Sequence, residues 1–550
     1  MNAFLDHLLY NPKEPLTFVS IFFWIYFSVV LVGFVMLRKR LAIRNAYLFL
    51  ISLYFYYKTS YWFVFLLLFS TGVDYSIGRA LGTIHQQGWR KALVALSVTI
   101  NLSVLFYFKY VYFFSDILKA SFGIDWTPVA HYALWSNQSF GTDFVTDRIF
   151  LPVGISFYTF QCISYTVDVF RRRIEPVKSP LDFGFYISFF PQLVAGPIVR
   201  ASDFIPQLYK PYQVTRTEFG LGLFWILNGL LKKVFLADYI ALNFIDRVFA
   251  QPTLYTGIET ALALIGYSLQ VYADFSGYTD VAIGVALWMG FSLTKNFHSP
   301  YKATSVADFW KRWHMSLSGW LRDYVYIPLG GNRSGTVASY VLVYLGLLGV
   351  ALAADSWETP AIISGVVAGV YAVYKIWPKF REWLNTNVNL MLTMLLGGIW
   401  HGASWNFVLW GGLNGLGLVF YKGWQAIRPY KSRGFWIKAV GVLLTFTFIT
   451  FTRIWFRSPD LETAQVILDR MQNNMSWALL LPVMIGFWKP LSVMVLGYGI
   501  HMIPESGKQA YRLLFARTHW ALQGVVAVLS VLIMYQVMTA ESQPFIYFQF

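Results

Sequence analysis

Charged residues are scarce in this sequence: they make up 13% of its 550 residues, against about 25% in ordinary soluble domains. Hydrophobic residues reach 57% and aromatic residues 19%. No stretch longer than a few tens of residues lacks an apolar run, which excludes a separate soluble domain of ordinary size. We therefore predict an all-α, polytopic membrane protein with one integral-membrane domain over residues 1–550.

Cysteine pairs, metal motifs and nucleotide-binding glycine loops are also missing. The single cysteine, Cys162, cannot form an internal disulfide bond. No two of the eight histidines have the spacing of an HExxH zinc motif, and the chain has neither a CxxC pair nor a Walker A loop. A GxSxG elbow is absent, because Gly154, Ile155 and Ser156 are followed by Phe157 and Tyr158. We expect no bound metal and no tightly bound cofactor.

Acidic residues are outnumbered, 27 against 43 basic residues, which gives a formal net charge of +16. The basic residues lie in short clusters between apolar runs, at 38–40, 171–173 and 232–233. Such clusters are typical of positive-inside signals and lipid-headgroup contacts. We therefore expect membrane lipids and no nucleic acid as partners, and we expect Lys232 and Lys233 to be interfacial.

The first apolar run, residues 16–37, is longer than the roughly 7–15 residues of a signal-peptide core. It is predicted to remain as a transmembrane helix. Arg38, Lys39 and Arg40 follow it at once, which places its C-terminal end in the cytoplasm. The N-terminus of this multi-pass protein is therefore predicted to lie outside the cell membrane.

Further apolar runs predict about ten to thirteen membrane crossings. The candidate spans are residues 92–108, 150–169, 219–231, 261–273, 337–353, 390–400, 405–420, 440–451, 477–500 and 522–537, together with 47–69, which is either one tilted helix or two short ones. Residues 183–200 are apolar but contain Pro191, Gly196 and Pro197, so a re-entrant segment beside a cavity is predicted there.

Two other segments are expected outside the hydrocarbon. Residues 297–335 combine tryptophans and tyrosines with basic residues, which is typical of an interfacial layer on the cytoplasmic side. In residues 456–474, Ser458 is predicted as the N-cap and Pro459 as the first residue of a short helix.

Two histidines are the leading functional candidates. His401 lies in GGIWHGASW at the end of an apolar run, where glycines let a substrate approach and tryptophans exclude water. His314 lies among tryptophans in FWKRWHMSLSGW, where an interfacial histidine bonded to a carbonyl is an equally good interpretation. Asp274 and Asp280 do not share a helical face well, so polar contacts across the bundle are favoured over a paired-carboxylate device.

Four segments carry a resemblance to a known family: PQLVAGPIVR, DFSGYTDVAIG, DFWKRWHMSLSGWLRDYVYIPLGGNR and GGIWHGASWNFVLWGGLNG. Together they resemble the membrane-bound O-acyltransferase family, in particular its alginate O-acetyltransferase branch, over a motif core of about residues 151–421. The resemblance implies a bundle with re-entrant and interfacial helices around a central tunnel. It also implies acetyl transfer from a cytoplasmic donor, acetyl-CoA or another acyl thioester, to an extracytoplasmic polysaccharide through a periplasmic acetyltransferase or esterase-like partner.

The resemblance maps the family's invariant histidine onto His401 and its partner histidine onto His314. An imidazole can accept the proton of an attacking hydroxyl, so His401 is the expected general base, although an acyl-histidine intermediate is left open. Around these two residues we expect a set of substrate-binding residues. They are Trp400, Trp313, Asn406, Arg322 and Arg333, although lipid contacts are the simpler interpretation of the arginines.

Two alternative functions are left open by the residues. Transfer of D-alanine to teichoic acid from a carrier protein would use the same histidines. A polysaccharide or lipid transporter would explain the many helices and the broken segment, but it needs no pair of titratable side chains.

Overall fold

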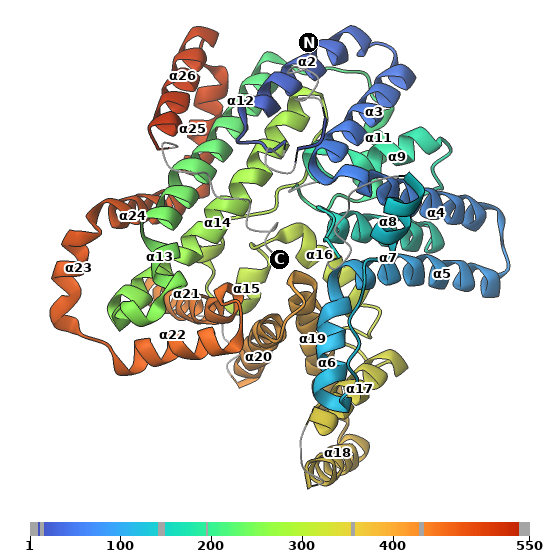
Figure 1. Ribbon diagram of the computed structural model, residues 1–550, viewed down its shortest axis with the longest axis vertical. Helices are drawn as coiled ribbons and strands as arrows, with labels where there is room; N and C mark the ends of the chain where they lie inside the picture. Colours follow the sequence, from blue (N-terminus) through green and yellow to red (C-terminus); the bar gives the residue numbers. More distant parts are fainter. Residues whose placement is uncertain are drawn as a thin grey trace.

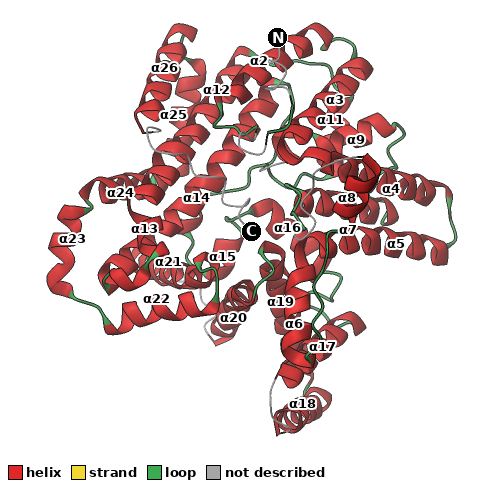
Figure 2. Cartoon of the chain, in the orientation of Figure 1, coloured by secondary structure: helices red, strands yellow, loops and turns green. Residues whose placement is uncertain are grey.

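The computed structural model describes residues 9–11, 16–140, 149–193, 196–353, 358–427 and 434–537. Every regular element in these ranges is helical (Figures 1 and 2). The α-helices are α2 (Ile21–Leu37), α3 (Leu41–Ser60), α4 (Val64–Thr83), α5 (Gln87–Leu105), α6 (Val111–Phe122), α7 (His131–Phe140), α8 (Ile155–Phe170), α9 (Pro180–Ser188), α10 (Phe190–Leu193), α11 (Ala201–Leu208), α12 (Arg216–Leu230), α13 (Asp246–Ala250), α14 (Gly257–Trp288), α15 (Val306–Trp310), α16 (Met315–Leu321), α17 (Val337–Ala353), α18 (Glu358–Ile376), α19 (Pro378–His401), α20 (Trp405–Ile427), α21 (Phe435–Arg457), α22 (Leu461–Asn473), α23 (Leu480–Gly486), α24 (Trp488–Met502), α25 (Glu505–Arg517) and α26 (Trp520–Val537). Short π-helices are η2 (Phe106–Tyr110), η3 (Leu231–Asp238), η4 (Ala241–Ile245) and η7 (Arg322–Tyr326), and 3₁₀ turns are η1 (Tyr61–Phe63), η5 (Pro252–Leu254), η6 (Pro300–Lys302) and η8 (Trp477–Leu479). The chain is thus an all-α, polytopic membrane protein, as the composition predicts.

Five helical runs in the described residues are long and apolar enough to cross a membrane, or six if the bent pair α23 and α24 forms one span. The runs are Leu41–Thr83, Gln87–Phe122, Arg216–Ala250, Phe435–Arg457 and Trp520–Val537. This number is lower than the predicted ten to thirteen crossings. Interior helices explain the difference, because α14 buries Asp274 and Asp280, and α19 buries Asn385 and Asn389. A helix that packs against protein can carry such residues where a lipid-facing helix cannot.

The segment 183–200 is broken twice, after Ser188 at the end of α9 and after Leu193 at the end of α10. The described side chains of α9 and α10 from Asp182 onward are buried in protein. Tyr186 of α9 donates a hydrogen bond to the carbonyl oxygen of Val199, 3.0 Å away, which ties the returning chain to the helix. The helix breaks therefore fall inside the segment predicted from its prolines and glycine, and protein surrounds the interrupted backbone.

Helices α12 and α14 pack at the centre of the molecule, side by side in Figure 1. Gly229 and Gly277 make their close approach possible: a Cβ atom on Gly229 would lie 2.4 Å from the carbonyl oxygen of Gly277. The chain continues from α12 into η3, where Lys233 is 2% exposed and its Nζ lies 2.7 Å from both Asp238 and Asp274. The prediction that Lys233 is interfacial is therefore wrong. Its charge is compensated inside the bundle.

Asp274 and Asp280 bind different lysines, because Lys232 lies 2.7 Å from Asp280. This confirms the favoured interpretation of the two carboxylates as polar contacts across the bundle.

The predicted cap of α22 is wrong: Asp460 caps the helix by accepting from the backbone N–H of Thr463 at 2.7 Å. Ser458 instead donates to Ile454 at the end of α21, 2.8 Å away, so it belongs to the preceding helix.

Candidate active site

Close packing of α19 against α20 fixes the end of α19, where His401 lies. A Cβ atom on Gly398 would lie 2.3 Å from the carbonyl oxygen of Phe407, and one on Gly411 would lie 2.6 Å from that of Met394. Only a residue without a side chain allows backbones to approach so closely. The glycines on either side of the histidine motif thus have a structural role, which is to hold His401 against the start of α20.

The His401 side chain is buried, with 3% of the residue exposed, and aromatic rings surround it. Its ring centroid lies 4.9 Å from that of Trp400, 5.0 Å from that of Trp410 and 5.4 Å from that of Phe456, each in an edge-to-face arrangement. Such an enclosure excludes water and strengthens electrostatic interactions at the imidazole.

The C-terminal carbonyl groups of α19 are held by a distant part of the chain. Lys109 donates from Nζ to the carbonyl oxygens of Trp400 (2.6 Å) and His401 (3.2 Å), and Tyr110 donates to that of Ile399 (3.0 Å). Both donors lie in the π-helical segment η2, between α5 and α6. A side-chain donor at a helix C-terminus satisfies the last carbonyl groups, which have no partner within the helix. Lys109 therefore fixes the backbone position of His401.

His314 precedes α16 in a left-handed backbone conformation, with φ 43° and ψ 55°. Its Nδ1 lies 3.2 Å from Oδ1 of Asn296. The same oxygen accepts from the backbone N–H of Ser316 (3.1 Å) and from the Ser316 hydroxyl (2.9 Å). A backbone N–H can only donate, so the Asn296 atom facing it must be the carbonyl oxygen, and His314 must carry its proton on Nδ1. Asn296 therefore leaves Nε2 as the ring atom that can accept a proton.

The His314 ring is fully buried among aromatic side chains. Its centroid lies 4.7 Å from Phe275, 6.0 Å from Trp400 and 6.5 Å from Phe157. Burial lowers the pKa of His314 to about 3, because desolvation disfavours the charged imidazolium. The ring is therefore neutral at physiological pH. Since Trp400 contacts both imidazoles, the fold brings His314 and His401 to the same tryptophan.

A buried arginine adds positive charge to this site. Arg453 of α21 is 1% exposed, and its guanidinium carbon lies 4.6 Å from the ring centroid of Trp313 and 5.2 Å from that of Phe456. Within the described ranges, no carboxylate lies within ion-pair distance of Arg453. A guanidinium stays charged in proteins, so Arg453 provides a fixed positive potential next to the rings that contact the histidines.

A cavity of about 520 Å³ lies beside His401, between α15, α16, α19 and α20. These helices meet near the centre of the view in Figure 1. Its wall includes His401, Trp410, Gly397 and Arg322. Asn296 lines a second cavity of about 360 Å³. His401 therefore lies at the wall of the larger cavity, and Asn296, the hydrogen-bond partner of His314, lies at the wall of the smaller one.

The predicted substrate-binding residues fall into two groups. Trp400 and Trp313 are buried next to the histidines, and Arg322 lines the larger cavity while pairing with Asp323 at 2.7 Å. Asn406 is buried elsewhere, and its amide donates to the carbonyl oxygen of Ser458 at 2.8 Å.

Arg333 is exposed in the turn before α17 and does not line the cavity beside His401. Asn406 thus joins α20 to the end of α21, and neither it nor Arg333 contacts the candidate site.

Three residues of the site were missed by sequence reasoning: Asn296, Lys109 and Arg453. Asn296 lies in an irregular segment without a periodic pattern, and Lys109 is far from His401 in sequence. Arg453 interrupts an apolar run, TFTFITFTRIWF, and this was a usable signal. An ionisable residue within such a run is by default a functional candidate.

Comparison with known proteins identifies the family. A model of the membrane-bound O-acyltransferase family matches residues 148–352. A probable alginate O-acetylase from Pseudomonas aeruginosa is 34% identical over 448 residues, which cover 79% of this chain and 71% of the relative. The chain belongs to the membrane-bound O-acyltransferase family. Another relative, the peptidoglycan O-acetyltransferase of Helicobacter pylori, is 31% identical over 487 residues, covering 82% of this chain and 78% of the relative.

A more distant relative is the teichoic acid D-alanyltransferase of Bacillus subtilis. It is 27% identical over 307 residues, covering 54% of this chain and 67% of the relative. Family membership confirms the resemblance seen in the four motifs and makes the chain a multi-pass membrane O-acyltransferase. The transporter interpretation is therefore replaced by an enzymatic one.

Proposed function

We propose that this O-acyltransferase moves acetyl groups from a cytoplasmic thioester donor, acetyl-CoA or another acyl thioester, across the inner membrane for O-acetylation of an extracytoplasmic polysaccharide. The observation that carries the proposal is the position of His401 at the wall of the 520 Å³ cavity, with Trp400 in contact with the rings of both His401 and His314. Two cavities, one at His401 and one at the hydrogen-bond partner of His314, suit an enzyme that binds both a donor and an acceptor. The proposed orientation has the N-terminus outside and residues 297–335 on the cytoplasmic side.

The chemistry assigns different roles to the two histidines. His401 accepts the proton of the attacking hydroxyl group while the hydroxyl oxygen bonds to the thioester carbonyl carbon. The carbon–sulfur bond then breaks, and His401 returns the proton to the leaving sulfur, so that a thiol is released. His314, neutral and held by Asn296, orients the reacting groups on the smaller cavity's side. Arg453 stabilises the negative charge that develops on the carbonyl oxygen through its potential. A metal is not needed, because a thioester is already activated.

Acetyl transfer is favoured over D-alanyl transfer by the extent of the similarity. The relatives named for O-acetylation cover 79% and 82% of this chain, whereas the D-alanyltransferase covers 54%. We also propose that a separate periplasmic acetyltransferase or esterase-like protein completes the transfer to the polysaccharide. D-alanyl transfer would instead require a carrier protein and its ligase encoded nearby.

The O-acetyl content of surface glycans in a deletion strain tests the proposal. Complementation with the wild-type gene should restore O-acetyl groups, and complementation with His401→Ala should not, at equal protein levels in the membrane. Unchanged O-acetyl content with loss of D-alanine esters in the deletion strain would favour D-alanyl transfer. Full restoration by the His401→Ala gene would contradict the assignment of the site.

A further inference from the structure

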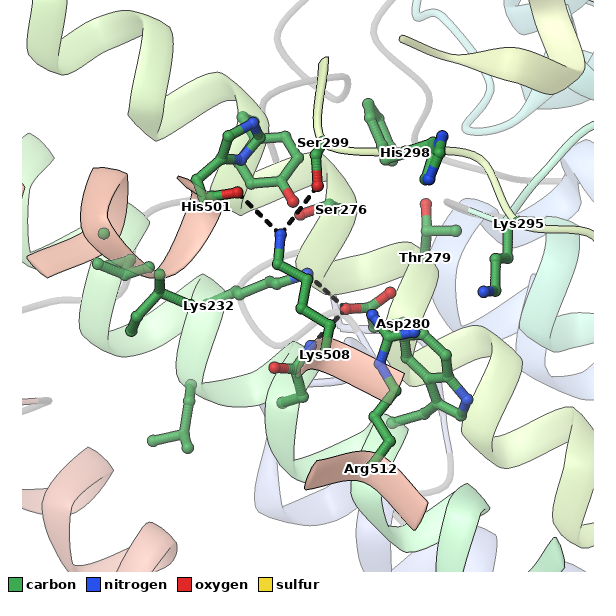
Figure 3. A pocket seen from close by; sticks show the side chains of 18 of the residues that line it. Lys232, Ser276, Thr279, Asp280, Lys295, His298, Ser299, His501, Lys508 and Arg512 are labelled. Atoms are coloured by element: carbon green, nitrogen blue, oxygen red, sulfur yellow. Dashed lines mark hydrogen bonds and ion pairs between the residues drawn. The ribbon is translucent and has the colours of Figure 1, made fainter. Parts of the chain in front are cut away.

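The smaller cavity, which Asn296 lines, has more basic than acidic side chains in its wall. It has a volume of about 360 Å³ and lies among η3, α14, α24, α25 and the segment 295–299 (Figure 3). Four basic side chains line it, namely Lys232, Lys295, Lys508 and Arg512, together with two carboxylates, Asp280 and Glu505. The cavity therefore has an excess of positive charge even with its histidines neutral.

The two carboxylates are already used by two of the basic residues. Asp280 pairs with Lys232 at 2.7 Å, and Glu505 pairs with Arg512 at 3.2 Å. In the part of the chain that the structure describes, no carboxylate lies within ion-pair distance of Lys508. The same holds for Lys295 among the described residues, and its Nζ lies 6.0 Å from the ring centroid of Trp225. Lys508 is thus an ammonium group without a carboxylate partner inside the protein, and the exposed Lys295 adds a second positive charge at the cavity.

Lys508 gives the stronger indication of a bound anion, because only 7% of the residue is exposed to solvent. Its Nζ donates to the Ser299 hydroxyl (2.8 Å) and to the carbonyl oxygen of His501 (2.9 Å), both uncharged acceptors, as Figure 3 shows. Burial, together with the nearby charges of Lys302 and Lys232, lowers the pKa of Lys508 to about 8. The charge of Glu505 offsets only part of this lowering, and a buried ammonium with no carboxylate at ion-pair distance is costly, so a bound anion would stabilise it.

The cavity wall also has a shape suited to more than a simple ion. The Arg512 guanidinium stacks 4.7 Å from the ring centroid of Trp225, which holds it at the cavity. The lining also includes the aliphatic side chains of Leu496, Ile500 and Ile533. Basic and aliphatic side chains in one cavity match a ligand that has both a phosphate and a hydrocarbon-like portion.

We propose that this cavity binds the phosphate group of an amphiphilic phosphate ester through Lys508, Lys295 and Arg512. Two sources share this chemistry: the headgroup of an anionic membrane lipid, and a soluble phosphate ester such as the nucleotide part of a thioester donor. The second source rests on the proposed function, whereas the first does not. Since Asn296 belongs to the cavity wall and binds His314, a ligand here lies next to the candidate active site.

Binding to the purified full-length protein tests the proposal without measuring acyl transfer. Native mass spectrometry counts bound dioleoylphosphatidylglycerol, with dioleoylglycerol as the lipid that lacks a phosphate, and calorimetry measures binding of coenzyme A. The variant is the double substitution Lys508→Gln and Arg512→Gln. The matched control is Lys489→Gln, an exposed lysine of α24 that does not line the cavity.

The proposal expects one of the two phosphate probes to bind wild type and Lys489→Gln equally, and the double variant at least about tenfold more weakly. Phosphatidylglycerol binding identifies a lipid site, and coenzyme A binding identifies a soluble ester. Equal binding of dioleoylglycerol and phosphatidylglycerol, binding of neither phosphate probe, or unchanged binding in the double variant would overturn it. If the double variant fails to fold, Lys295→Gln gives a second test, because its exposed side chain leaves the fold intact. Unchanged binding in a folded Lys295→Gln protein would overturn the assignment.

Discussion

Asn296 offers a sharp perturbation, because one oxygen atom controls the protonation state of His314. Its Oδ1 accepts hydrogen bonds from His314 Nδ1, Ser316 N and Ser316 Oγ at 3.2, 3.1 and 2.9 Å. Asn296→Ala removes all three. Each buried donor that loses its acceptor costs about 1–3 kcal/mol, and the lost preference for the Nδ1 proton, about 0.5–1.5 kcal/mol, redistributes the tautomers by roughly twofold to twelvefold. We expect turnover to fall by about twofold to twelvefold, with a small change in KM and a lower Tm.

Asn296→Asp separates the tautomer argument from simple loss of stability. A carboxylate accepts the same hydrogen bonds, so the Nδ1 proton stays in place and activity near neutral pH should be retained. Its negative charge also favours imidazolium, which raises the pKa of His314 from about 3. Because the pKa of His314 is about 3 in the wild-type protein, protonation of His314 should not lower wild-type activity between pH 5 and 8. The Asn296→Asp variant should lose activity at a higher pH than wild type as the pH falls.

The measurement is the pH dependence of acetyl transfer by purified protein, scored per folded molecule. Asn387→Ala is the matched control, because Asn387 is a buried asparagine of α19 whose amide donates to Trp383 of its own helix at 2.8 Å. It should keep wild-type turnover. Wild-type turnover in well-folded Asn296→Ala protein would refute the claim that Asn296 sets the tautomer of a functional histidine.

Other parts of the structure make three further predictions. Lys109→Met should leave the carbonyl groups of Trp400 and His401 without this donor, shift His401 and lower turnover about tenfold or more. The measurement is kcat at matched protein level, and an unaltered kcat would contradict the prediction. Lys233→Met should destabilise the protein by about 3–5 kcal/mol, since it leaves two buried carboxylates without their lysine. Lys119→Met removes an exposed ion pair and should cost about 1 kcal/mol or less. Equal shifts in Tm for the two variants would argue against a buried triad. A cysteine at exposed Ser334 in a Cys162→Ala background should react only with reagents that reach the cytoplasm, and labelling from outside intact cells would reverse the proposed orientation.

Apolar runs located most helices but not their full lengths, and α19 shows why. The sequence predicts a span over residues 390–400, whereas the helix begins at Pro378. The added turns are polar, yet Asn389 is fully buried and donates to the carbonyl oxygens of Gly331 and Ser334, each at 3.0 Å. Polar residues that find partners in a neighbouring segment cost little in a helix interior, so an apolarity rule begins the helix too late.

The histidine pair could be selected from sequence, but its supporting residues could not. His401 and His314 stand out because titratable groups are rare in apolar sequence. Their partners depend on contacts between distant segments: Lys109 reaches α19 from η2, and Asn296 reaches His314 from an irregular segment. Asn406, predicted from the sequence as a substrate-binding residue, donates to the carbonyl oxygen of Ser458, a contact that its place in the GGIWHGASWN motif does not indicate. Proximity in sequence is a weak guide to which side chains share a cavity.

The central claim is that His401 takes a proton in the acyl-transfer step, and one comparison tests it most directly. Purified wild-type and His401→Ala proteins are scored for Tm and for acetyl transfer from acetyl-CoA or a thioester surrogate. The account predicts a folded variant with transfer lowered by about 10²- to 10⁴-fold, the usual worth of a positioned general base, and a smaller loss for His314→Ala. Wild-type turnover per folded molecule of His401→Ala, with only a lower Tm, would show that His401 supports the helix junction and does no chemistry.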